Sequence, residues 1–266
     1  MDKVIKIYKN KGETPLDCIK KYKVDNPSLE HLPITYAGRL DPLAEGVLIL
    51  LVGDECQKKN EYLKLGKVYE VDILFGFATD TYDVMGKVFE TESTELFEMV
   101  WHRLPSPSSE DLSNRLGDEV SKVLSQFTGK IKQKYPIYSS RPVKGKPLFM
   151  WAREGKLEEI EIPSHEVFVE SIDLIGEDFI TGEKLLEKIK NDVSLVKGDF
   201  RQKEIINLWQ ENLENKKEEK YKTVKIRVQC GSGVYVRALA YDIGQKLGIP
   251  SLALNIKRTK VGGYEI

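Results

Sequence analysis

Apolar and polar residues alternate along two stretches of the chain, Lys67–Gly76 and Thr223–Cys230. A period of two residues is typical of a β-strand that buries one face, and each stretch reaches a glycine where the alternation stops. Weaker alternation predicts three further strands, at residues 84–90, 165–175 and 252–266. We therefore expect the chain to fold around a sheet.

Apolar residues at helical spacing predict helices at residues 14–22, 118–127 and 234–247. Thr14 can cap the first of these helices, and Gly248 ends the last. The strands are spaced too irregularly along the chain for a doubly wound parallel sheet. The pattern therefore predicts an α+β fold.

Two segments interrupt this pattern. Residues 91–116 contain PSPSSED and are expected to form an acidic, partly mobile excursion. Residues 181–222 are rich in Lys and Glu and carry apolar side chains at helical spacing, which predicts two or three amphipathic helices in an added lobe.

The composition allows one composite domain, or one domain with a small lobe, because 266 residues with 41% hydrophobic content can bury a sizeable core. The three cysteines have no CxxC pairing and the three histidines lie far apart, so neither a disulfide framework nor a structural zinc site is expected. The N-terminus lacks the apolar core of a signal peptide, and no run approaches the ~20 apolar residues of a membrane span. We expect a soluble, cytoplasmic protein with no membrane partner.

The net charge is only −1, but charge is segregated along the chain. Between Gly129 and Lys156 the basic residues are accompanied by one acidic residue, Glu154, and by interleaved aromatic residues. Such a stripe suits phosphate contacts combined with base stacking, whereas a charge run can equally be a solvated face. On the residues alone both interpretations stay open. The basic residues are Lys130, Lys132, Lys134, Arg141, Lys144, Lys146, Arg153 and Lys156.

The stretch YAGRLDPLAEG, residues 36–46, places Asp41 between Leu40 and Pro42. Gly38 gives the backbone freedom on one side, and the proline fixes φ and removes an amide on the other. We expect a rigid loop that docks on the apolar run VLILLVG and holds the carboxylate in one orientation. Position alone does not distinguish a functional carboxylate from one that caps a turn.

Two other stretches combine a strand with polar residues. KVYEVDILFGFATDTYDVMG leads from a strand into a loop with Asp80 and Asp83, whose oxygens are too few for a calcium loop, so a hydrogen-bonded turn is expected. Residues 228–248 join a strand to a helix through a GSG turn, with Arg237 in the first helical turn. The helix dipole disfavours an arginine there, which predicts a specific carboxylate partner.

Together and in this order, the stretches resemble the motifs of the TruB family of tRNA pseudouridine synthases. GRLDPLAEGVL is similar to the family's glycine-threonine-leucine-aspartate-proline-leucine-alanine loop, and KVY with TDTYD to its lysine-x-tyrosine strand and the turn that follows. Three later stretches, FTGKIKQKYPIYSSRPVKGKPLFMWAREG, CGSGVYVRALAYDIG and KRTKVGGY, resemble later family motifs. The opening KNKGETPLDCI looks like the family's start, so the resemblance covers most of the chain.

The resemblance implies the pseudouridine synthase fold, with a mixed, mostly antiparallel central sheet flanked by helices. We expect one catalytic domain over residues 1–266, with residues 181–222 as a helical insertion and no C-terminal PUA domain. The implied enzyme detaches uracil from its ribose, turns it and reattaches it through carbon, in the T-arm of tRNA. We expect a monomer without a metal or organic cofactor, because the isomerisation involves no redox change.

By the same resemblance, Asp41 is the catalytic carboxylate, whether it attacks the sugar or removes a proton from it, and Arg237 pairs with it. Tyr69 stacks on the flipped uracil, near the proton that leaves carbon. Tyr235 shapes the same pocket, and Leu252 completes its wall. The basic segment clamps the RNA backbone through Lys130, Lys132, Arg141, Lys144 and Lys146.

Two residues of the loop depart from the family's pattern. Tyr36 stands where the family usually has a histidine that helps hold the flipped conformation, and Arg39 replaces the usual threonine. Arginine-leucine-aspartate is similar to the ribosomal-RNA branches of the superfamily. Arg39 could fill the gap left by the flipped base, contact a phosphate or hydrogen-bond the loop. A ribosomal-RNA synthase and a non-catalytic RNA-binding or tRNA-folding protein therefore stay as alternatives.

Overall fold

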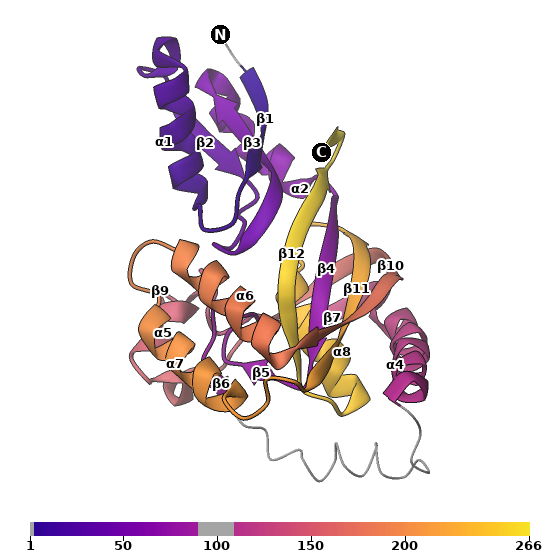
Figure 1. Cartoon of the computed structure of the whole chain (residues 1–266). Coiled ribbons are helices and arrows are strands. Elements are labelled where there is room, and N and C mark those ends of the chain that lie inside the picture. Colours follow the sequence, from indigo (N-terminus) through magenta and orange to yellow (C-terminus); the bar gives the residue numbers. More distant parts are fainter. Residues whose placement is uncertain (1–2, 90–108) are drawn as a thin grey trace.

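The protein folds around one large sheet (Figure 1). Nine strands form this sheet in the computed structural model, which describes residues 3–89 and 109–266. The strand order is β1–β3–β12–β4–β11–β10–β7, with β2 paired to β3 and β13 paired to β12. Neighbours are antiparallel except for β3 and β12, so the mixed, mostly antiparallel sheet is confirmed. The strands are β1 (Lys3–Lys9), β2 (Ile34–Ala37), β3 (Ala44–Val52), β4 (Lys67–Phe75), β7 (Gly129–Lys134), β10 (Ser164–Thr181), β11 (Lys220–Cys230), β12 (Ser251–Val261) and β13 (Tyr264–Glu265).

Helices pack on both faces of the sheet. None of the helices in the described residues is both long and apolar enough to cross a membrane. Two short hairpins lie outside the sheet, β5 (Ala78–Thr79) with β6 (Val88–Phe89) and β8 (Pro142–Val143) with β9 (Lys146–Pro147). The helices are α1 (Pro15–Asp25), α2 (Lys59–Lys64), α4 (Ser109–Leu124), α5 (Leu148–Arg153), α6 (Gly182–Leu195), α7 (Gln202–Leu213) and α8 (Val236–Leu247), and short 3₁₀ turns span Pro27–Leu29, Gly53–Lys58, Ser125–Phe127 and Leu157–Glu159.

Two apolar cores lie on opposite faces of β4, whose side chains alternate between them. Val71 and Ile73 join the first core, which packs beneath α4 and α8. Leu74 joins the second core, which is filled by α6 and α7 and centres on Trp209. The strand expected at Lys67–Gly76 is therefore present as β4, and helices cover both of its faces rather than one.

The N-terminal lobe is the third part of the fold, drawn in indigo at the top of Figure 1. It consists of β1, β2 and β3, with α1 packed near Leu48 and Leu50 and α2 near the neighbouring residues of β3 on the other face. Thr14 caps α1 as expected: its hydroxyl accepts from the Asp17 amide at 3.2 Å, and the Asp17 carboxylate accepts from the Thr14 amide at 2.9 Å.

Most expected elements are present, with boundaries that move. The strands expected at 223–230 and 165–175 are longer, and the C-terminal stretch 252–266 is a strand, a turn at Gly262 and a second short strand. Of the two or three helices expected within 181–222, two are present, α6 and α7, whereas residues 220–222 belong to β11.

Two expectations are wrong in part. Of the strand expected at 84–90, only Val88–Phe89 is extended among the described residues, because hydrogen bonds to Asp83 fold the preceding residues into a turn. The excursion expected at 91–116 lies outside the described residues as far as position 108, but α4 already begins at Ser109. Leu116, Val120 and Leu124 are spaced by four and all buried, so the helical period extends further back than the expected start at 118.

The core of the α6–α7 pair yields a prediction about Trp209. This side chain is fully buried, its ring lies 5.1 Å from that of Phe77, and its indole N–H has no hydrogen-bond partner among the described residues. Trp209→Ala should lower the free energy of unfolding by about 3–5 kcal/mol, because it leaves a large cavity. Trp209→Phe keeps a ring and removes the unpaired donor, so its loss should be clearly smaller in the same urea titration. Equal losses would contradict this description of the core.

Candidate active site

The loop that carries Asp41 is anchored on both sides of the carboxylate. Leu40 is buried in the first core and Leu43 in the second, whereas the Asp41 side chain keeps 37% of its surface exposed. Further along, a Cβ on Gly46 would collide with the Arg258 carbonyl oxygen, so only glycine permits the parallel pairing of β3 with β12 at this point. The loop is thus anchored as expected, but not on the apolar run that follows it: Leu40 and Leu43 enter the first and second cores, whereas residues 47–51 pack in the N-terminal lobe.

Two buried cations bind the backbone of this loop from beneath. The Lys9 ammonium donates to the carbonyls of Pro42 at 3.0 Å and Ala44 at 2.5 Å. Burial lowers the pKa of Lys9 to about 8. The Arg258 guanidinium donates to the carbonyls of Gly38 at 3.0 Å and Val47 at 2.8 Å. Carbonyls on either side of Asp41 are therefore fixed by charge-assisted hydrogen bonds.

Arg237 has the carboxylate partner that its position in the sequence predicted, and the partner is Asp41. Its Nε lies 2.9 Å from Asp41 Oδ2, and its side chain is almost fully buried in the first turn of α8. Nη1 donates to the Thr81 carbonyl at 2.7 Å and Nη2 to the Tyr138 carbonyl at 2.9 Å. Burial acts to lower the pKa of Arg237, but the Asp41 and Asp83 carboxylates outweigh it and raise that pKa. The guanidinium is thus a fixed positive charge with three separate acceptors.

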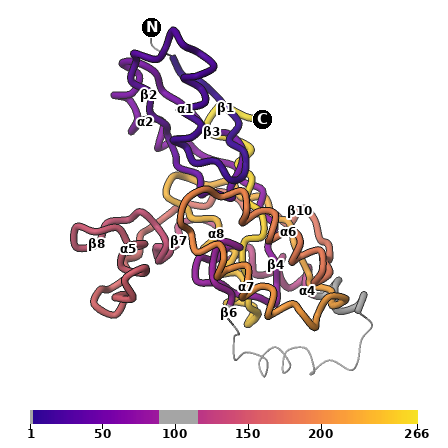
Figure 2. Tube along the Cα trace, turned by 60° about the vertical axis from the view of Figure 1, so that its left-hand side comes forward, coloured from indigo at the N-terminus to yellow at the C-terminus, as the bar shows by residue number. Residues whose placement is uncertain are grey.

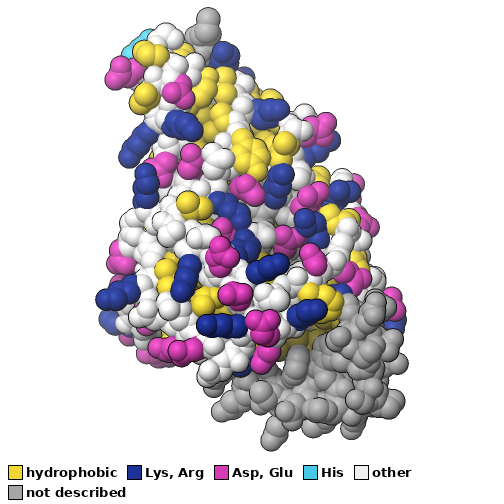
Figure 3. Space-filling view, viewed as in Figure 1, with side chains coloured by type: hydrophobic (Ala, Val, Ile, Leu, Met, Phe, Trp, Pro, Cys, Tyr) yellow, Lys and Arg dark blue, Asp and Glu magenta, His cyan; other side chains and the backbone are white. Residues whose placement is uncertain are grey.

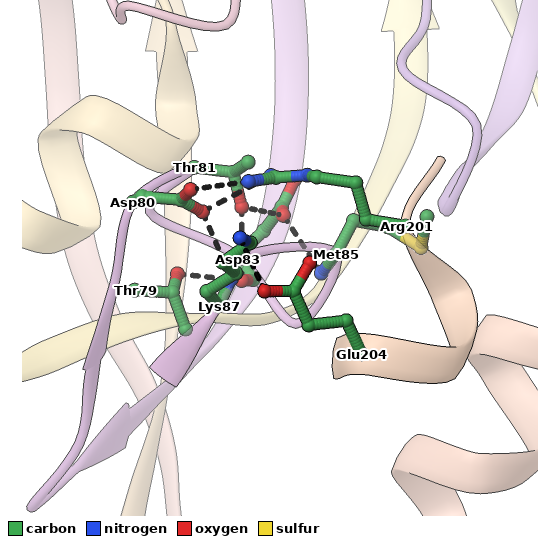
Figure 4. Close-up of polar contacts among 8 residues, drawn as sticks. All are labelled: Thr79, Asp80, Thr81, Asp83, Met85, Lys87, Arg201 and Glu204. Carbon is green, nitrogen blue, oxygen red and sulfur yellow. Dashed lines mark hydrogen bonds and ion pairs between the residues drawn. The ribbon is translucent and has the colours of Figure 1, made fainter. Parts of the chain in front are cut away.

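The turn after β5 is held by its own polar side chains (Figure 4). Asp83 Oδ1 accepts from the Thr81 hydroxyl at 2.6 Å and from the Met85 amide at 2.9 Å. Asp80 Oδ1 accepts from the Lys87 amide at 2.9 Å. These bonds confirm the expected hydrogen-bonded turn. The described residues contain no group of three or more His, Cys, Asp or Glu side chains that could hold a metal ion.

Two tyrosines flank the Asp41–Arg237 pair. Tyr69 is buried on the same face of β4 as Val71 and Ile73. Burial raises the pKa of Tyr69, against the opposing effect of the Arg258 guanidinium. Tyr235 immediately precedes α8, and its backbone exchanges two hydrogen bonds with the Gln133 side chain, at 2.9 and 3.1 Å.

A cavity of about 880 Å³ opens over these residues. Five of the residues expected in the site line it: Arg39, Asp41, Tyr69, Tyr235 and Arg237. Thr81, Phe200 and Arg201, which the sequence did not single out for the site, line it as well, as do Tyr138, Phe149 and Arg153 of the basic segment.

Two expected pocket residues do not line this cavity. The Tyr36 ring packs in the N-terminal lobe with Lys59 Nζ 5.1 Å from its centroid. Leu252 is fully buried in the second core. Leu252 and Leu254 of β12 enter the second core, under α6 and α7, whereas Ala253 between them enters the first. A match of motifs does not show which face of a strand a residue lies on.

The expected RNA clamp lies on β7 and on the segment that carries β8, β9 and α5. That segment protrudes from the body of the protein at the left of Figure 2. Lys130 and Lys132 are exposed on β7. The charged groups of the other three have partners nearby in the chain. The Arg141 guanidinium lies 5.0 Å from the centre of the Tyr135 ring, and the Lys146 ammonium lies 3.7 Å from the centre of the Trp151 ring. The Lys144 ammonium donates to the Glu159 carbonyl at 3.0 Å.

Comparison with solved structures identifies the fold. The chain superposes on Cbf5 in the crystal structure of a Cbf5–Nop10–Gar1 complex with a TM-score of 0.54 and 17% identity, over 98% of this chain and 49% of that one. An H/ACA RNP bound to a substrate RNA containing 2′-deoxyuridine gives a TM-score of 0.52 at 16% identity. The chain spans about half the length of these solved chains. It has the pseudouridine synthase fold.

Sequence comparison gives the family. Residues 28–181 match the N-terminal domain of the TruB family of pseudouridylate synthases. The chain is 32% identical to a tRNA pseudouridine synthase B of Ligilactobacillus salivarius, with 100% of this chain covering 69% of that protein. It is 30% identical to that of Caldanaerobacter subterraneus, over 100% of this chain and 71% of the relative. The chain belongs to the TruB family.

The buried Asp83 carboxyl gives a prediction about stability and pH. Burial raises the pKa of Asp83 to about 6, from 3.8. The folded state therefore binds more protons than the unfolded state between these values, and ionisation of Asp83 lowers the stability as pH rises through them. Asp83→Asn should gain stability relative to the unmutated protein between pH 4 and 6, by up to about 3 kcal/mol.

The measurement is urea unfolding at a series of pH values. Asp173→Asn, at an exposed position of β10, is the control for a surface carboxylate. A stability difference for Asp83→Asn that does not change with pH would contradict the prediction.

Proposed function

We propose that this protein is a tRNA pseudouridine synthase that isomerises the T-loop uridine, with Asp41 as its catalytic carboxylate. The observation that carries the proposal is one carboxylate, held by a buried guanidinium at 2.9 Å, at the wall of a cavity large enough for a nucleotide. Membership of the TruB family and relatives named tRNA pseudouridine synthase B support the substrate class.

The reaction breaks the bond from C1′ to N1 and forms one from C1′ to C5. The proton on C5 is then lost and N1 gains one, so the product is an isomer of the substrate. Atoms and electrons balance without an oxidant. Asp41 acts at the sugar, either by attack at C1′ or by removal of a proton, and both roles need an oriented carboxylate beside the glycosidic bond. Tyr69 stacks on the flipped uracil, Tyr235 shapes the same wall, and Arg237 keeps Asp41 in place.

Recruitment of RNA depends on the basic segment. The part of it that carries β8, β9 and α5 protrudes from the body of the protein (Figure 2). Arg141 and Lys146 lie over the rings of Tyr135 and Trp151. This mixture of cations and rings supports backbone contacts and stacking rather than a merely solvated face. By contrast, the face over α6 and α7 mixes Lys and Arg with Asp and Glu side chains (Figure 3), so it offers no single-sign field for a polyanion. We place this activity in the cytoplasm.

Arg39 favours a second candidate, a synthase for ribosomal RNA. Its side chain lines the cavity and has no hydrogen-bond or ion-pair partner among the described residues, so it is available to RNA. Incubation with unmodified tRNA and with ribosomal RNA from a deletion strain separates the two. Pseudouridine in the tRNA T-loop supports the proposal, and pseudouridine in ribosomal RNA alone supports the second candidate.

The direct test of the catalytic role is Asp41→Asn. The amide preserves shape but removes the charge, so turnover of unmodified tRNA should fall by at least about 10³-fold, the scale seen when a catalytic nucleophile is removed. Tritium release from C5-labelled uridine measures it. RNA affinity should change little, which a filter-binding titration checks. Full activity of this variant would disprove the role, whereas RNA binding without any turnover by the unmutated protein would leave only a binding or folding function.

The clamp makes a separate prediction. Replacing Lys130 and Lys132 with alanine should weaken tRNA binding and reduce the slope of log K against log salt, by roughly 0.7–0.9 for each phosphate that is no longer neutralised. Turnover at saturating tRNA should stay nearly constant. Lys220→Ala is the matched control, because Lys220 is exposed at the end of β11 and does not line the cavity. An unchanged salt slope in the double variant would show that these lysines do not contact RNA.

A further inference from the structure

We infer that Arg201, which immediately precedes α7, is a positioning residue for the Arg237–Asp41 pair. Its expected effect on turnover rests on the proposed function. The side chain comes from the segment between α6 and α7, which packs against the second core, and it reaches the wall of the cavity. It binds the two segments whose carbonyls orient Arg237.

The first segment is the turn after β5. Arg201 Nη1 lies 2.6 Å from Asp80 Oδ2 and Nη2 lies 3.2 Å from Asp80 Oδ1, a two-pronged contact with about a fifth of each side chain exposed (Figure 4). The next residue is Thr81, whose carbonyl accepts from Arg237. A bidentate guanidinium–carboxylate pair fixes both distance and orientation, so it limits where this carbonyl can lie.

The second segment contains Tyr138. The Arg201 guanidinium lies 4.3 Å from the centre of the Tyr138 ring, at the distance of a cation–π contact. The carbonyl of Tyr138 is the third acceptor of Arg237. Arg201 therefore contacts the segments that supply two of the three acceptors of the buried guanidinium, and only the contact with Asp41 itself is independent of it.

The backbone of Arg201 adds a second observation. Its φ is 63°, in the left-handed region that glycine and asparagine adopt more easily than arginine. A glycine or asparagine would adopt this backbone conformation at a lower cost in free energy, so the local fold alone does not explain an arginine here. The contacts with Asp80 and Tyr138 give the arginine its reason.

A neighbouring ion pair provides a control, because it joins α7 to the turn after β5 without contacting the acceptors of Arg237. Glu204, in the first turn of α7, pairs with Lys87 of the turn after β5 at 2.5 Å. Its charge acts on Arg201 only through space, and neither Glu204 nor Lys87 contacts Tyr138 or Arg237 in any described interaction. Removal of this pair weakens the attachment of α7 to the turn and leaves the acceptors of Arg237 in place.

The test compares Arg201→Ala, Arg201→Lys and the matched control Glu204→Gln in the full chain. Arg201→Ala should lower kcat on unmodified tRNA by about 10- to 100-fold, since misplacement of a catalytic group by about an ångström has effects of this size. KM should stay within about threefold, because the RNA clamp is intact. Arg201→Lys should restore only part of kcat, because an ammonium cannot make the two-pronged contact. Glu204→Gln should match the unmutated protein.

A second readout does not depend on activity. In the ¹⁵N spectrum of arginine side chains, the Arg237 Nε–H signal, assigned by its absence in Arg237→Lys, should shift or broaden in Arg201→Ala and stay unchanged in Glu204→Gln. An unchanged signal together with unchanged kcat would overturn the inference, as would equal effects of Arg201→Ala and Glu204→Gln. If the unmutated protein modifies no RNA, the proposed function fails, and the spectrum alone still decides the positioning role.

Discussion

The contact between the Arg237 guanidinium and the Asp41 carboxylate is the interaction on which the rest of the site depends. A buried guanidinium is stable only when it has acceptors, and here one carboxylate and two backbone carbonyls each accept from one of its three nitrogens. Three segments distant in sequence must therefore meet at α8. That requirement ties the carboxylate loop, the turn after β5 and the protruding basic segment into one structure.

The Asp41 loop shows how the fold leaves one carboxylate exposed and oriented. Leu40 and Leu43 enter different cores, and Lys9 and Arg258 hold the carbonyls on both sides from below. The backbone has little freedom, so the side chain that remains at the cavity has a fixed direction. Preorganisation of this kind lets a charged group act without reorganising at the moment of reaction.

Sequence reasoning recovered what is local or periodic. Alternation located β4 and β11, and the dipole argument gave Arg237 a carboxylate partner. It missed Phe200 and Arg201, because their place at the cavity depends on how the segment before α7 packs, which no local pattern encodes. The backbone of Arg201 is left-handed, a conformation that a glycine in the sequence would have indicated. An arginine gives no such indication.

Modification of the T-loop uridine of tRNA at the Asp41 site can be measured in cells by mapping pseudouridine across total RNA, from a strain with the gene and from one without it. T-loop pseudouridine should disappear from tRNA in the deletion strain and return when the unmutated gene is restored. Unchanged tRNA, with the loss confined to ribosomal RNA or absent altogether, would contradict the proposed function.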